Sequence, residues 1–148
     1  MKPMDEEMQR RVWDRVRGEG KENDPEITLQ TLAVEEKRAG AMYLMLARMM
    51  QGRNKLLLRQ LAEQSRSHAA CLNGMGILEG GKALSTKFNL PAQELPVITL
   101  RKCYAHSLRC ARFYGSKDGP YAHIFREMAQ RSRDQGRMIL EILGSLEG

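Results

Sequence analysis

Four stretches of the 148-residue chain carry apolar residues three and four positions apart, the spacing that places side chains on one face of a helix. They cover residues 26–51, 54–79, 97–116 and 121–146. The first and second stretches, and the third and fourth, are joined by links so short that each pair must form an antiparallel hairpin. The sequence therefore predicts an all-α four-helix bundle built from two hairpins.

The segment between the hairpins, residues 80–96, holds two prolines and no sustained period, and we expect it to be a long crossover. Asn54 is predicted to cap the second helix, and Gly80 with Gly81 to end it. Before the bundle, residues 1–25 are predicted to form a separate N-terminal amphipathic helix and linker. Trp13 on that helix needs a covering surface, so we expect a homodimer or another protein partner. Residues 26–148 form the bundle domain.

Composition and charge narrow the class of protein. Ten methionines and few β-branched residues favour helices over sheets. The net charge is +6, but the arginines are dispersed at helical spacing, so nucleic-acid binding is the least favoured of the functions considered. No apolar run approaches the roughly 20 residues that span a bilayer. Three cysteines without a Cys-x-x-Cys pair are typical of reduced thiols, and we expect a cytoplasmic protein with no membrane association.

The apolar stripe along one face of each predicted helix, here called its seam, is interrupted near its middle by polar residues. These are Glu36 in the first helix, Ser65 and His68 in the second, Ser107 in the third, and Ser132 and Gln135 in the fourth. A polar position in all four helices predicts a polar layer that crosses the bundle. The two hairpins also align as an internal repeat, which matches Glu36 with Ser107 and His68 with Gln135. The hairpins are therefore interpreted as copies of one unit.

This pattern resembles the ferritin-like superfamily, and within it the rubrerythrin-like domains, over about residues 26–146. The resemblance implies a non-haem di-iron oxidoreductase fold in which one helix of each hairpin gives a Glu and the other a Glu-x-x-His. Glu36 and His68 match two of those six ligand positions. The other four positions are occupied by Ser65, Ser107, Ser132 and Gln135. Without three of the four carboxylates, the mutual repulsion of two irons is uncompensated.

The resemblance therefore implies a degenerate di-iron site, and the leading expectation is a binding or structural protein without a cofactor. Glu36 and His68 are expected to remain as a buried hydrogen-bonded pair. The alternative is an oxidoreductase acting on peroxide or oxygen, with a single iron or zinc held by these two residues and nearby thiols. The cysteines available are Cys71, Cys103 and Cys110. Such an enzyme would need a separate redox partner, because the chain has no Cys-x-x-Cys iron module.

Several neighbouring residues have simpler expected roles. Tyr43 and Tyr114 are equivalent in the repeat and are expected to pack in the interior with satisfied hydroxyls. His106 precedes the seam residue Ser107 and lies about 100° around the helix from it. We therefore predict that His106 lies at the surface of the bundle or at the edge of its interior. The same prediction applies to His123. Glu35 and Glu63 are off the seams and are expected to be solvated.

Overall fold

The computed structural model describes residues 28–90 and 92–147, and these residues form helices and no strands. The helices are α2 (Leu29–Arg48), α3 (Gly52–Gly80), α4 (Pro96–Gly115) and α5 (Ala122–Glu147). The prediction of an all-α four-helix protein is confirmed. The helix predicted within residues 1–25 lies outside the described residues. Within the described part, no helix is both long enough and apolar enough to cross a membrane.

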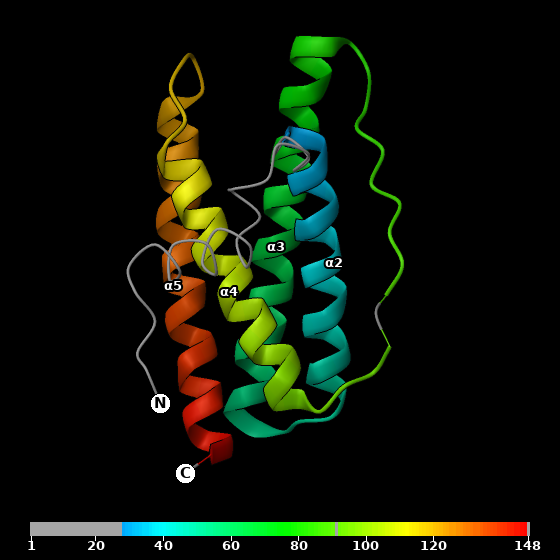
Figure 1. Ribbon diagram of the computed structural model, residues 1–148, viewed down its shortest axis with the longest axis vertical. Helices are drawn as coiled ribbons and strands as arrows, with labels where there is room; N and C mark the ends of the chain where they lie inside the picture. The colour runs from blue at the N-terminus through cyan, green and yellow to red at the C-terminus, as the bar shows by residue number, and fades with distance from the viewer. Residues whose placement is uncertain (1–27, 91, 148) are drawn as a thin grey trace, which may run out of the picture.

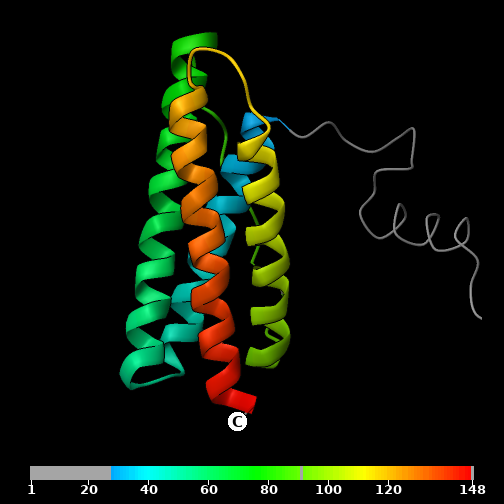
Figure 2. The same ribbon diagram turned by 90° about the vertical axis from the view of Figure 1, so that its left-hand side faces the viewer.

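The helices pack as two hairpins placed side by side (Figures 1 and 2). α2 packs mainly on α3 and α4 mainly on α5, with further contacts between α3 and α5 and between α2 and α4. The segment between α3 and α4 runs from one end of the bundle to the other, as Figure 1 shows in green. α3 and α4 therefore run in the same direction, and helices in contact run antiparallel.

The helix ends follow local backbone chemistry. Thr28 caps α2 through a reciprocal pair of hydrogen bonds with Thr31. Gly81, with φ of 72°, ends α3 in the left-handed conformation, as predicted. The prediction that Asn54 caps α3 is wrong. Gly52 has a φ of 64°, which lets the chain turn into α3 two residues earlier, and the Asn54 amide instead donates to Ser145 Oγ at 2.7 Å.

Two apolar clusters fill the bundle, one toward each end. One contains Leu58, Leu61, Leu100, Ile139 and Ile142, and the other contains Leu32, Leu72, Met75, Phe125 and Met128. Between these clusters along the four helices lie the buried polar residues Glu36, Ser65, His68, Ser107, Ser132 and Gln135. The predicted polar layer is confirmed. Because burying polar side chains is unfavourable unless they are hydrogen-bonded, the contacts within this layer decide what it can do.

Gly76 is where the crossover packs on α3. A Cβ atom at this position would lie 2.7 Å from Leu84 Cγ, and the Leu84 amide is held by Asn73 Oδ1 at 2.6 Å. Gly76→Ala should therefore lower the free energy of unfolding by about 1 kcal/mol or more, although alanine favours helix. Gly74→Ala is the matched control, because its Cβ would contact nothing within 4 Å, and it should raise stability by about 0.5–1 kcal/mol. Urea unfolding measures both changes, and equal effects would contradict this packing.

Candidate functional site

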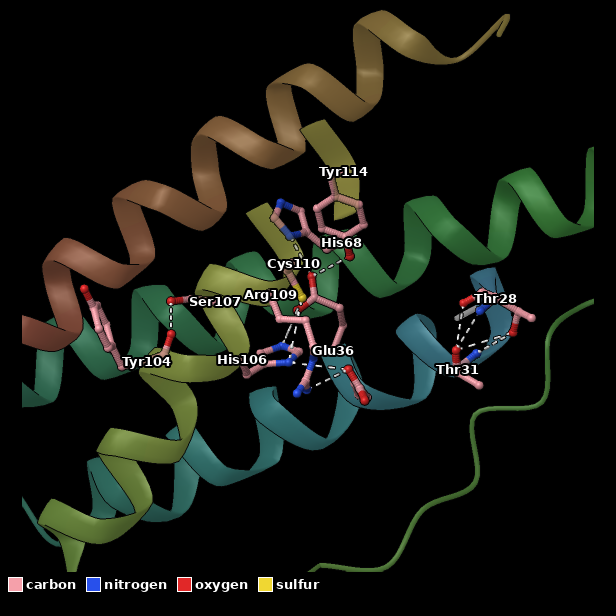
Figure 3. A network of polar contacts seen from close by, with 11 residues as sticks. Thr28, Thr31, Glu36, His68, Tyr104, His106, Ser107, Arg109, Cys110 and Tyr114 are labelled. Atoms are coloured by element: carbon pink, nitrogen blue, oxygen red, sulfur yellow. Dashed lines mark hydrogen bonds and ion pairs between the residues drawn. The ribbon is translucent and has the colours of Figure 1, made fainter. Parts of the chain in front are cut away.

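Glu36 is the centre of a buried hydrogen-bond network between three helices. Its side chain from α2 is 1% exposed. Oε2 lies 2.7 Å from His68 Nδ1 of α3 and accepts from the Tyr114 hydroxyl of α4 at 3.2 Å. Oε1 lies 3.0 Å from His106 Nε2, also from α4. Both carboxylate oxygens are thus engaged, as Figure 3 shows.

Small residues let the first two helices come close enough for this contact. A Cβ atom on Gly40, one turn beyond Glu36, would lie 3.4 Å from the Ala62 carbonyl oxygen and 3.8 Å from Ser65 Cβ. A bulky side chain at position 40 would push α2 away from α3. The expected hydrogen bond between Glu36 and His68 is confirmed, and the close approach of their two helices explains its short length.

His106 connects Glu36 to a cysteine and to a second carboxylate. Cys110 lies one turn further along α4, and its Sγ is 3.5 Å from His106 Nε2. His106 Nδ1 lies 3.7 Å from the same sulfur and 3.6 Å from Glu35 Oε2. Arg109 in turn donates to Glu35 Oε2 at 3.1 Å. The imidazole is therefore held between two carboxylates that follow one another in the sequence.

The prediction that His106 lies at the surface or boundary is wrong, because its side chain is 11% exposed and contacts Glu36. The predicted position of His106 beside the seam of its helix is correct. However, α4 packs against α2 as well as α5, so a residue on the flank of its seam faces a second helix. The spacing His106-x-x-x-Cys110 was the available signal, since it puts two ligand-type side chains on one face.

Hydrogen bonding decides whether Glu36 and His106 are ionised. Burial opposes ionisation of Glu36, but the hydrogen bonds from His106 and His68 outweigh it and lower its pKa from 4.5 to about 2. Burial alone would lower the pKa of His106, yet its contacts with Cys110, Glu35 and Glu36 raise the pKa well above 6.5. Burial raises the pKa of the Cys110 thiol above 9.0. The metal-free site is thus a carboxylate and imidazolium pair beside a neutral thiol.

These shifts predict how stability depends on pH. The lowered Glu36 pKa contributes stability that is fully present above about pH 4.5 and is lost as pH falls through about 2. The raised His106 pKa contributes stability below 6.5 that is lost as pH rises through its folded-state value. The gap in unfolding free energy between metal-free wild type and Glu36→Gln should narrow by about 2–3 kcal/mol from pH 6 to pH 2. Urea titrations measure the gap, and a constant gap would contradict the assignment.

Three side chains of this network have the atoms and spacing of a metal site. One ligand atom each from Glu36, His106 and Cys110 lies within 4.8 Å of the other two, and all three residues are buried. His68 was predicted as a residual ligand, but it lies outside this group and contacts Glu36 through the opposite oxygen. The described residues thus bring Glu36 together with His106, a histidine that was not among the predicted ligands.

The remaining polar layer is only partly hydrogen-bonded. Ser107 donates to the Tyr104 carbonyl at 2.7 Å, and Gln135 donates to Gln64 Oε1 at 3.2 Å. Ser65 Oγ and Ser132 Oγ are buried without a partner, and so is His68 Nε2. None of Ser65, Ser107, Ser132 and Gln135 carries a carboxylate, and Glu36 is the one buried carboxylate among the described residues.

The tyrosines and cysteines differ in their surroundings. Tyr114 donates to Glu36, as expected, whereas the buried Tyr43 hydroxyl lies beside the Cys103 thiol and makes no hydrogen bond of ordinary geometry with the described residues. Burial raises the pKa of the Cys103 thiol to about 11. Cys71 is half-buried on α3 and lies outside the ligand group.

Two of the four acidic and histidine residues predicted off the seams are as exposed as predicted, and His106 is one of the two that are not. Glu63 and His123 are exposed, which confirms the prediction for both. Glu35 is half-buried instead, with 35% of its side chain exposed, because it pairs with Arg109 and His106.

A cavity of about 250 Å³ opens between α2 and α4 and reaches the ligand group at one point. His106 lines it, while Glu36 and Cys110 lie behind His106 and do not. Comparison of the chain with family models, curated proteins and solved structures finds no match. The functional argument therefore depends on the geometry of the site.

Proposed function

We propose that the chain is a ferritin-like four-helix protein that binds one divalent transition-metal ion through Glu36, His106 and Cys110. One observation carries the proposal: three side chains with different ligand atoms converge in a buried place, each atom within 4.8 Å of the others. Carboxylate, imidazole and thiolate together form a donor set suited to Zn²⁺, and also to Fe²⁺.

The charges of the three ligands support a divalent ion. When Cys110 is deprotonated, its thiolate and the ionised Glu36 together cancel two positive charges. His106 binds through a neutral ring, so the loaded site is neutral overall and its burial is tolerable. Loading releases the protons held by His106 and Cys110, and affinity should therefore rise with pH.

Residues around the ligands support the same proposal. A histidine ligand in proteins usually donates its other ring N–H to a carboxylate, which fixes the ring orientation. Glu35 occupies that position against His106 Nδ1, and Arg109 holds Glu35 in place. On the far oxygen of Glu36, His68 and Tyr114 play the corresponding role.

One ion accounts for these residues better than two. Two irons within bonding distance need several carboxylates to offset their repulsion, and this interior supplies one. The hairpin pairing and the long crossover support a ferritin-like architecture, and Ser65, Ser107 and Ser132 stand at positions that hold carboxylates in the family it resembles. The di-iron ancestry and the single-ion site are parts of one proposal.

The number of ligands bears on what the bound ion does. Three protein ligands leave a position for water or a small molecule, an arrangement found in catalytic metal sites, where the ion acts as a Lewis acid. The role of this chain is to hold and orient the ligands and to exclude bulk water around them. An oxidoreductase acting on peroxide or oxygen requires iron at this site and a separate electron donor. For a binding or structural protein, zinc at this site is sufficient. The metal that co-purifies with the protein distinguishes these two roles.

Glu35→Gln tests the proposed orientation of His106. The variant keeps the shape of the side chain but removes the charge that faces Nδ1, and Zn²⁺ affinity should fall about 10- to 100-fold. The matched control is Glu63→Gln, since Glu63 is an exposed glutamate away from the site. A competition titration against a chromophoric chelator measures both. Equal affinities for the two variants would contradict the proposed role of Glu35.

A further inference from the structure

The cavity between α2 and α4 has two chemically different parts. Its inner part is formed by the buried residues Ala39, Cys103 and His106 and the half-buried Met42, which present mostly apolar or weakly polar surface. Its outer part carries the exposed cationic side chains of Arg38, Lys102 and Arg109 and the half-buried acids Glu35 and Glu94. A molecule that enters would meet charge first and apolar surface at the inner end.

One cationic side chain of the cavity has no ion-pair partner within the described part of the chain. Lys102 is paired with Glu94 at 2.6 Å, and Arg109 with Glu35 at 3.1 Å. Arg38 makes no ion pair with any residue in 28–90 or 92–147, and it lines the same cavity. Because an arginine guanidinium pairs with a carboxylate through two parallel hydrogen bonds, the unpaired Arg38 is suited to hold an anionic group.

We infer that this cavity binds a short-chain carboxylate, with its carboxylate group on Arg38 and its apolar tail against Met42 and Cys103 beside His106. A volume of about 250 Å³ suits a small ligand. The apolar inner surface favours a carboxylate with a tail over inorganic phosphate, which has no apolar part to bury. The inference goes beyond the proposed metal site and does not require a bound metal, although an occupant would lie next to one of the ligands.

The test is a calorimetric titration of the full-length, metal-free protein with acetate, propionate and butyrate at constant ionic strength. We expect affinity to increase about two- to fourfold for each added methylene. Arg38→Ala should weaken propionate binding about three- to tenfold, because one charge-assisted contact at a partly solvated site is lost. Arg59→Ala on α3 is the matched control, since Arg59 is an exposed arginine that does not line the cavity, and it should bind as the wild type does.

A second readout locates the ligand. In protein labelled at methionine methyl groups, propionate should shift the Met42 resonance and leave that of Met128, which lies in the opposite apolar cluster, unmoved. Absence of binding, equal weakening by the two arginine substitutions, or phosphate binding as tightly as propionate would each overturn the inference. A failure of Zn²⁺ to bind would disprove the proposed metal site and would leave this metal-free comparison intact, so the two failures are distinguishable.

Discussion

Replacing Cys110 with alanine should weaken Zn²⁺ binding by more than about a hundredfold. Loss of a residue that only orients a ligand costs 10- to 100-fold, and loss of a ligand should exceed that range. The thiolate also supplies one of the two negative charges, so its loss leaves a buried site with a net positive charge. Competition with a chromophoric chelator measures the affinity.

The control for this prediction is Cys71→Ala. Cys71 is half-buried on α3, outside the ligand group, so its replacement should leave Zn²⁺ affinity within about threefold of the wild-type value. Thermal unfolding followed by circular dichroism establishes that both variants keep the fold. If the two alanine variants bind Zn²⁺ equally well, Cys110 is a small core residue and the proposed donor set is wrong.

Glu36→Gln should destabilise the metal-free protein by about 3–5 kcal/mol at pH 6. The substitution preserves volume but removes the charge that compensates His106, and an uncompensated buried charge is among the most destabilising consequences of a single substitution. The lowered pKa of Glu36 gives a similar magnitude, since a decrease from 4.5 to about 2 corresponds to about 3 kcal/mol. Urea unfolding measures the change.

Glu35→Gln is the matched control for stability as well. Glu35 is partly exposed, so solvent screens its contacts with both Arg109 and His106, and such pairs contribute about 0–1 kcal/mol. A loss below about 1 kcal/mol is expected. If Glu36→Gln were no more destabilising than Glu35→Gln, the buried pair with His106 would not be the feature that stabilises the centre of the bundle.

The seams of the helices made most of the interior predictable. Each polar residue that interrupts a seam is buried, from Glu36 to Gln135, because a side chain between apolar neighbours three and four positions away must face the same way. The hydrogen bond between Glu36 and His68 was expected on different grounds, from the resemblance to the rubrerythrin-like ligand pattern, which left these two residues as a buried pair. Helical periodicity thus identified the seam residues as buried.

Periodicity alone did not predict the residues beside the seams. The side chain of His106 is buried because α2 crosses the flank of α4, and which helices are adjacent depends on the crossover rather than on the pattern within α4. Asn54 was misassigned for a different reason. Its side chain is suited to a cap, but a glycine with positive φ two residues earlier had already started the helix.

Several polar atoms of the buried layer bear on the stability of the fold. Ser65 Oγ, Ser132 Oγ and His68 Nε2 make no hydrogen bond with another described residue, and burying a polar atom that stays unpaired is unfavourable by about 1–3 kcal/mol. A layer kept only for stability would be better filled with apolar side chains. The layer fits the proposed single-ion site better than it fits a simple core.

X-ray absorption spectroscopy on the zinc-loaded protein tests the central claim most directly. The account predicts one ion per chain, with a single sulfur at about 2.3 Å and nitrogen or oxygen ligands at about 2.0–2.2 Å. The sulfur contribution should disappear in Cys110→Ala and persist in Cys71→Ala. Two ions per chain, or a spectrum without sulfur in the wild-type protein, would contradict the account.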